Sequence, residues 1–342
     1  MYNLEYEKEI SDFTANSNLD FLNNTTILIT GGTGLILSYF VDSVLQSNLS
    51  INLVLLCRNK NSAVERFNKY NKDKRLTILQ ADLTKKIEVP YQVDYILSGA
   101  SFADPKSYAT KPVETINTNV LGNYNLFEFA KTQKKLKKFV VFSSCEIYGE
   151  NKETLYEDTF GLVKTTDVRS CYNESKRLIE TMAVAYSSEY NINTVIARLS
   201  RVYGPTVKLA DSKAIFQFIF NALNKKDIVL KSTGEQQFSY CYVSDAINAI
   251  LTLMQNGENA QAYNITNDTE VIKLKDIAKI IADICGVKII FDLPTQQEAN
   301  AYSRAVIALQ NCDKLKAIGW KPQVDFVCGI KKTLNILKNR IK

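Results

Sequence analysis

Short runs of apolar residues alternate with longer amphipathic stretches from about residue 25 to residue 200. The runs have the length of buried strands, and strands that are apolar on both faces are typical of a parallel sheet covered by helices. This alternation predicts an α/β fold with a doubly wound parallel sheet. The predicted strands are 25–30, 51–57, 75–82, 93–100, 138–144 and 193–200, and the predicted helices include 35–47, 112–135 and 171–190.

The regular alternation weakens after about residue 200. Helices are still predicted at 214–224, 274–285 and 325–338, and a strand followed by a helix at 239–256. We expect residues 1–22 to be an amino-terminal extension of unknown role and residues 23–200 to form the sheet domain. Residues 201–342 should form mainly a smaller α/β lobe that binds substrate, with the segment 239–256 returning to the sheet.

A glycine-rich segment, Thr30-Gly31-Gly32-Thr33-Gly34-Leu35-Ile36-Leu37, follows the first predicted strand and opens the first predicted helix. Backbone at such a turn can approach a pyrophosphate closely, and the helix N-terminus supplies unpaired N–H groups. The same glycines also suit an ordinary strand–turn–helix connection. Leucine stands where dinucleotide-binding loops have a third glycine, so we expect Leu37 to push the helix outward or to turn into the core. The predicted phosphate contacts are Gly31, Thr33, Gly34, Leu35 and Ile36.

The second predicted strand ends in Cys57-Arg58-Asn59-Lys60, without the carboxylate that usually holds the adenosine ribose. Arg58 can stack on adenine or meet a 2′-phosphate, so NADP stays possible beside NAD. A solvated arginine at a strand end is an equally good account. Asp82 ends the third predicted strand and is placed to meet the adenine amino group.

Tyr172 and Lys176 are four residues apart in the predicted helix 171–190, so both side chains project from one face. An ammonium beside a phenol stabilises the phenolate, and we expect it to lower the pKa of Tyr172 toward neutrality and make it a proton acceptor. Ser144 ends a predicted strand at the edge of the sheet where ligands bind.

The chain of 342 residues has no histidine, seven cysteines without a CxxC pair, and a net charge of +6. Without histidine, Ser–His and Cys–His nucleophiles and histidine metal sites are excluded, and no metal site is predicted. The odd cysteine count indicates a reduced, cytoplasmic chain. The sequence contains no apolar run of about 18 residues, so no membrane span is predicted. The scattered lysines indicate solvated surface and no nucleic-acid partner.

The motifs together resemble the extended short-chain dehydrogenase/reductases of the nucleotide-sugar epimerase/dehydratase family, from about residue 25 to 335. The resemblance implies a Rossmann domain with a smaller carboxy-terminal substrate lobe, NAD as cofactor, a nucleotide-diphosphate sugar as substrate, and transient oxidation of the sugar at C4. The motifs are TGGTG, Ala81-Asp82-Leu83, ETINTNVLGNYNL, SSCEIYG, YNESK, ARLSRVYGP, YCYVSD and LKAIGWKP.

The resemblance also assigns roles to residues. Tyr172 is the implied base, Lys176 positions it and the nicotinamide ribose, and Ser144 binds the reacting hydroxyl. Further implied cofactor contacts are Leu83, Ala100 and Asn119, and further implied substrate contacts are Ser101, Phe102, Cys145, Phe218 and Tyr240. Arg201 and Arg304 are the candidate donors to the substrate phosphates.

Within this family, SGASFADPKSY and RSCYNESKR look most like UDP-glucuronate decarboxylases, which also carry a glutamate at the position of Glu146. The 4,6-dehydratases place an aspartate acid where this chain has Cys145, which disfavours dehydration. Decarboxylases typically carry an arginine at the position of Phe238. Because 4-epimerisation needs only Ser144, Tyr172 and Lys176, the sequence favours a 4-epimerase. The decarboxylase is the close alternative, and an NADPH-dependent 4-keto-sugar reductase and a silent binding protein stay open.

The resemblance implies a homodimer joined through the helices at 112–135 and 171–190. Leu121, Leu126 and Phe129 are the apolar positions expected to supply that interface, although burial inside the monomer accounts for them equally well.

Overall fold

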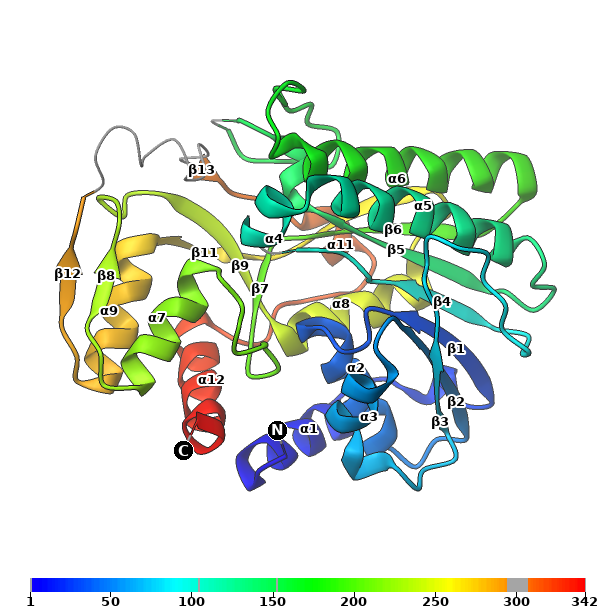
Figure 1. Cartoon of the computed structure of the whole chain (residues 1–342), viewed down its shortest axis with the longest axis horizontal. Coiled ribbons are helices and arrows are strands. Elements are labelled where there is room, and N and C mark those ends of the chain that lie inside the picture. Colours follow the sequence, from blue (N-terminus) through cyan, green and yellow to red (C-terminus); the bar gives the residue numbers. More distant parts are fainter. Residues whose placement is uncertain (1, 104, 152, 294–306, 342) are drawn as a thin grey trace.

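A seven-stranded sheet forms the centre of the larger part of the molecule (Figure 1). The computed structural model describes residues 2–103, 105–151, 153–293 and 307–341. The strand order is β3-β2-β1-β4-β5-β6-β10, and every neighbouring pair is parallel. The predicted α/β fold with a doubly wound sheet is therefore confirmed. The strands are β1 (Thr25–Thr30), β2 (Ile51–Cys57), β3 (Leu76–Gln80), β4 (Tyr95–Ser98), β5 (Lys138–Ser144), β6 (Thr194–Leu199) and β10 (Gln261–Ile265).

Helices cover both faces of this sheet, which is why its strands are apolar throughout. Helices α2 (Leu35–Gln46) and α8 (Val243–Asn256) pack on one face, and α5 (Pro112–Ala130) and α6 (Ser170–Tyr190) lie side by side on the other (Figure 1). Successive residues of β1 alternate between the two cores: Ile27 and Ile29 pack with α2 and α8, and Leu28 packs with α5 and α6.

A smaller lobe lies beside the sheet and contains a four-stranded and a two-stranded sheet. Strand β9 pairs with β7, β11 and β13, and β8 pairs with β12. The return of segment 239–256 to the large sheet differs from expectation: α8 packs on that sheet, but β9 belongs to the small lobe and β10 is the joining strand. The elements are β7 (Arg201–Tyr203), α7 (Ala214–Leu223), β8 (Ile228–Leu230), β9 (Gln237–Tyr242), β11 (Asn267–Lys273), α9 (Leu274–Cys285), β12 (Ile289–Phe291), β13 (Ile307–Ala308), α11 (Asp313–Ala317) and α12 (Phe326–Ile341).

The amino-terminal segment forms helix α1 (Leu4–Asn16), which packs on α2. Asn3 caps the helix by accepting the N–H of Tyr6 at 3.0 Å, and its side-chain amide donates to the Ile336 carbonyl of α12 at 2.9 Å. Buried Glu9 accepts hydrogen bonds from Tyr39 of α2 and Tyr242 of β9. Helix α1 therefore contacts both the large sheet's helices and the small lobe.

The remaining short elements connect the larger ones. Within the described ranges, no helix combines the length and apolarity that crossing a membrane requires. In that same part of the chain, no group of three or more cysteine, aspartate or glutamate side chains is arranged to hold a metal ion. The short elements are α3 (Lys60–Arg66), α4 (Pro105–Thr110) and the 3-10 helices η1 (Asp20–Leu22), η2 (Asn68–Tyr70) and η3 (Cys145–Tyr148).

Candidate active site

The glycine loop lies where the strand order of the sheet changes direction, between the ends of β1 and β4. Gly31 has φ of 72°, and a Cβ there would lie 2.5 Å from the carbonyl carbon and oxygen of Gly99. Both the dihedral angle and the close approach require glycine. Gly34 caps α2 with no side-chain hydrogen bond, so the first N–H groups of α2 stay available for an anion. This cradle fits the pyrophosphate of a dinucleotide.

Leu37, which replaces the third glycine of the loop, turns into the core and is 2% exposed. Its Cδ1 lies 2.5 Å from the point that a Cβ on Gly99 would occupy. The missing side chain at the end of β4 therefore makes room for the leucine at the start of α2. Of the two expected outcomes, the inward turn is the observed one.

The residues predicted for the adenosine end lie together at the carboxyl ends of β2 and β3. The guanidinium of exposed Arg58 lies 5.0 Å from the ring centre of Phe102. The Asp82 carboxylate accepts the N–H and the hydroxyl of Thr84, at 3.0 and 2.8 Å, and these bonds lower its pKa. The positive charge of Arg58 lowers that pKa further.

Three other predicted contacts lie beside the loop. The Ala100 N–H donates to the Thr30 hydroxyl at 3.3 Å. The Ser101 hydroxyl is buried and has no hydrogen-bond partner among the described residues, so it is available to a ligand. The side chain of Leu83 is buried in the core beneath α5, so any contact of Leu83 with a cofactor is made by its backbone.

The structure brings together the residues predicted to carry the chemistry. Ser144 ends β5, and its hydroxyl accepts the N–H of Glu146 at 3.2 Å. Tyr172, in the first turn of α6, is 7% exposed, and the Ser144 hydroxyl is near enough to lower its pKa. Lys176 lies one turn further along, with its Nζ 5.7 Å from the Tyr172 ring centre. The predicted Ser–Tyr–Lys grouping thus exists at the carboxyl edge of the sheet.

The prediction that Lys176 lowers the pKa of Tyr172 toward neutrality is wrong. Burial raises the pKa of Tyr172 well above its usual value, and the neighbouring Ser144 hydroxyl offsets only part of the rise. Glu146 and Tyr108 raise the pKa further. Burial also lowers the pKa of Lys176 to about 8, and its Nζ donates to the Phe142 carbonyl at 2.6 Å. Desolvation is the largest cause of the pKa shift in both groups.

An ion pair lies next to the Ser–Tyr–Lys grouping. Glu146, in η3, and Arg201, the first residue of β7, are 3.6 Å apart between Oε1 and Nη2, with side chains 32% and 22% exposed. The Arg201 guanidinium stacks over Phe238 of β9 at 3.6 Å from the ring centre. Tyr240 faces Arg201 in the strand pairing, and burial raises its pKa to about 12. Burial likewise raises the pKa of the Cys145 thiol to about 11.

Two contacts of Tyr172 are not predicted from the sequence, although Asn119 itself is predicted as a cofactor contact. Tyr108 of α4 is buried and stacks on Tyr172, with ring centres 5.3 Å apart. Buried Asn119 donates to the Ser175 hydroxyl at 2.8 Å, and that hydroxyl donates to the Tyr172 carbonyl at 3.0 Å. The Asn119 Oδ1 has no partner in the described part of the chain. Tyr108 lies in the quoted motif SGASFADPKSY, but only the fold shows that it meets Tyr172.

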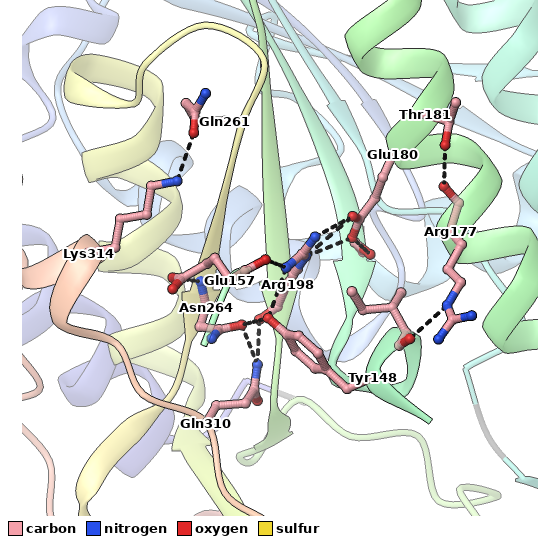
Figure 2. Close-up of polar contacts among 12 residues, drawn as sticks. Tyr148, Glu157, Arg177, Glu180, Thr181, Arg198, Gln261, Asn264, Gln310 and Lys314 are labelled. Carbon is pink, nitrogen blue, oxygen red and sulfur yellow. Dashed lines mark hydrogen bonds and ion pairs between the residues drawn. The ribbon is translucent and has the colours of Figure 1, made fainter. Parts of the chain in front are cut away.

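A buried polar network joins α6 to β6, β10 and η3 (Figure 2). Arg198 of β6 pairs with Glu180 of α6 at 2.8 Å and donates to the Tyr148 hydroxyl at 2.9 Å. That hydroxyl donates to Asn264 of β10 at 2.7 Å. Because Glu180 lies one turn beyond Lys176, its charge raises the Lys176 pKa against the larger lowering by burial. The network therefore holds α6 against the sheet, and Glu180 favours the charged form of Lys176.

Two predicted substrate contacts are not part of the Ser144–Tyr172–Lys176 grouping. Phe218 is buried in α7 within the larger core, where it packs, and its contact with a nucleotide base stays a prediction. Arg304 lies outside the described residues.

Fold and site together define a dinucleotide-dependent enzyme of the tyrosine–lysine type: a doubly wound sheet, a glycine cradle at its switch point, and a serine, tyrosine and lysine beside it. The family model for the NAD dependent epimerase/dehydratase family matches residues 27–266. The chain belongs to this family and is an NAD-dependent enzyme.

Several relatives of the chain are named for the same activity. The chain is 31% identical over 319 residues to UDP-glucuronic acid decarboxylase 6 of Arabidopsis thaliana, covering 91% of this chain and 88% of that protein. It is 26% identical over 321 residues to UDP-glucuronic acid decarboxylase 1 of Xenopus tropicalis, covering 92% and 73% of the two chains.

Solved structures with other activities share the fold. A UDP-glucose 4-epimerase from Thermotoga maritima, solved with UDP-glucose, has a TM-score of 0.81 at 21% identity and covers 93% of this chain and 100% of its own. A UDP-glucuronic acid 4-epimerase from Bacillus cereus, solved with UDP-glucuronic acid and NAD, has a TM-score of 0.79 at 20% identity, covering 92% and 99%.

Proposed function

We propose that the protein oxidises a UDP-hexuronic acid at C4 and releases its carboxyl carbon as CO₂, the reaction of a UDP-glucuronic acid decarboxylase. The observation that carries the proposal is the Glu146–Arg201 ion pair beside Ser144 and Tyr172. The guanidinium suits the carboxylate of an acidic sugar, and the Glu146 carboxylate beside it suits the protonation of C5, a step that decarboxylation requires and 4-epimerisation lacks. The names of the relatives at up to 31% identity support the same substrate.

The chain's own residues supply the proton transfers of the first step. The Tyr172 phenol oxygen accepts the proton of the C4 hydroxyl, and the Ser144 hydroxyl holds that hydroxyl in place. The accepting form of Tyr172 is the phenolate, which the Lys176 ammonium stabilises and which becomes a neutral phenol when it takes this proton. Gly31, Gly34 and the N-terminus of α2 would hold the NAD pyrophosphate, with Arg58 and Asp82 near its adenosine. When bound there, NAD would supply reversible hydride transfer at C4.

A ketone at C4 lies β to the carboxylate carbon C6, so the C5–C6 bond breaks with its electron pair moving into an enolate over C5, C4 and the C4 oxygen. CO₂ leaves, and Arg201 orients the carboxylate before this step. Glu146, with a third of its side chain exposed, relays a proton from water to C5. Tyr172 returns its proton to the C4 oxygen when the ketone is reduced, and the product is a UDP-pentose.

The test is turnover of UDP-glucuronic acid labelled with ¹³C at C6, followed by NMR. We expect labelled CO₂ and a UDP-pentose without consumption of added NADH or NADPH. The Tyr172→Phe variant removes the proton acceptor and should lower kcat by roughly 10²–10⁴-fold. Full turnover by Tyr172→Phe would contradict its role as the base.

The alternative function is the 4-epimerase that the sequence favours. One specific observation supports it: Phe238 occupies the position where decarboxylases typically carry an arginine. The same experiment separates the two. A 4-epimeric UDP-hexuronic acid that retains its label would establish the epimerase and contradict decarboxylation. Stoichiometric oxidation of NADPH would instead establish the reductase suggested by Arg58.

We also propose that two copies of the chain associate through α5 and α6. Exposed apolar side chains on both helices support this, and include Val113, Ile116, Leu121, Tyr124, Leu178 and Val184. Leu126 and Phe129, which the sequence also offers for this interface, are buried inside the monomer and do not contribute.

A further inference from the structure

The guanidinium of Arg201 is a positive charge in the site, and its part in substrate recognition is the question here. We infer that Arg201 recognises the carboxylate of the substrate, and that it exchanges its contact with Glu146 for this carboxylate when the substrate binds. The inference rests on the proposed function and deepens it, because it names the residue that distinguishes an acidic sugar from a neutral one.

Strand pairing brings Arg201 to its position. Arg201 lies opposite Tyr240 in the β7–β9 pair, and Phe238 is two residues before Tyr240 on the same face of β9. The guanidinium stacks on the Phe238 ring at 3.6 Å from its centre. This stacking fixes the plane of the guanidinium and leaves its edge, which carries the N–H donors, free to meet a planar anion.

The contact with Glu146 is loose. At 3.6 Å, the Nη2–Oε1 separation is an ion pair but is longer than a hydrogen bond of 2.7–3.2 Å. Among the described residues, Glu146 is the single carboxylate within ion-pair distance of Arg201. A guanidinium that is 22% exposed therefore keeps unused donors. An incoming carboxylate can form two parallel hydrogen bonds with it, which a hydroxymethyl group cannot do.

This geometry removes the sequence argument against a decarboxylase. The chain has Phe238 where decarboxylases typically carry an arginine. Arg201 places its guanidinium against the ring of Phe238. The positive charge is thus present, but it comes from the neighbouring strand. The exchange also frees Glu146 for proton transfer at the moment the substrate is in place.

The test measures binding of UDP-glucuronic acid and UDP-glucose to the full chain by titration calorimetry, with NADH in place of NAD so that C4 is not oxidised during the titration. We expect the wild type to prefer UDP-glucuronic acid. Arg201→Gln should weaken its binding by roughly 30-fold or more while changing UDP-glucose binding by less than about threefold. The double variant Arg201→Asn with Phe238→Arg should recover at least about tenfold of the loss, because it returns the charge from the other strand.

A second variant tests the exchange itself and does not depend on removing Arg201. Glu146→Gln leaves the guanidinium without its competitor, so UDP-glucuronic acid should bind at least as tightly as to wild type while kcat falls. Weaker binding to Glu146→Gln would overturn the exchange. Equal weakening of both sugars by Arg201→Gln, or no preference in the wild type, would overturn the assignment of Arg201.

Failure of the inference and failure of the proposed function give different results. If the wild type releases CO₂ while Arg201→Gln keeps the preference for the acid, the function stands and the inference is wrong. If Arg201 sets the preference but the product is a C4 epimer, the inference stands and decarboxylation is wrong.

Discussion

Leu37 and Gly99 are complementary in size, and each explains the other. The leucine fills the space that a side chain at Gly99 would take, so the fingerprint loses its third glycine without losing the close packing of α2 on the sheet. The departure from the fingerprint is thus a change of packing, and the phosphate cradle of Gly31 and Gly34 is retained.

We expect the two positions to be energetically coupled. Leu37→Ala should lower the free energy of unfolding by about 2–5 kcal/mol through an unfilled cavity, and Gly99→Val by about 1–3 kcal/mol through a clash with Leu37. The double variant should be more stable than the sum of the two losses predicts, by at least about 1 kcal/mol. Urea unfolding of the four proteins measures this. Additive losses would show that the two side chains do not share one space.

The sequence predicts the local part of the site and misses the part made by distant strands. Tyr172 and Lys176 share a helix face, so their spacing alone places them together. Arg201 and Phe238 meet only because β7 pairs with β9, and no local pattern encodes that pairing. The wrong direction for the Tyr172 pKa has a similar origin. Desolvation depends on Tyr108 and other groups far along the chain.

At the scale of elements, the continuous apolar runs of β2 and β5 and the amphipathic helices α5 and α6 follow the sequence closely. Strand β10 does not. Its five residues begin with polar Gln261, and its identity as the last strand of the sheet comes from pairing with β6, more than sixty residues earlier. Helix α1 is likewise a structural element whose role appears only when Asp42, Tyr39 and Tyr242 surround it.

Docking of α1 on α2 depends on the buried Asp42 carboxylate. Arg66 pairs with it at 2.5 Å, and Tyr2 and Tyr6 donate to it at 2.8 and 2.6 Å. Asp42→Asn should lower the free energy of unfolding by about 3–5 kcal/mol, because Arg66 is left buried without its counter-charge. Hydrogen exchange should rise first in residues 4–16.

The matched control is Glu88→Gln, which breaks the exposed pair with Lys86 at 3.0 Å. Its loss should stay below about 1 kcal/mol, because surface ion pairs contribute little. Comparable losses for Asp42→Asn and Glu88→Gln would contradict the role assigned to the buried pair.

At the scale of the whole molecule, α5 and α6 form the surface that we propose as the dimer interface. Both helices lie on the outer side of one sheet face (Figure 1) and expose apolar side chains at helical spacing, such as Val113, Ile116 and Tyr124. Light scattering during gel filtration should give the mass of a dimer at micromolar concentration.

Tyr124→Lys combined with Leu178→Lys should convert that dimer to a monomer by placing charges in the interface. The control is Leu209→Lys, an exposed leucine outside both helices, which should leave the dimer intact. A monomeric wild type would remove the proposal.

The contacts of α1 and α12 bear on how the chain can be shortened. The stretch recognisable as the family, 27–266, omits both helices. A fragment cut to those limits would lose the hydrogen bonds from the phenols of Tyr39 and Tyr242 to the Glu9 carboxylate. It would also expose the apolar side chains against which both helices pack. The unit that the family model outlines is therefore smaller than the unit that we expect to fold, and expression trials should begin before residue 4 and run past residue 336.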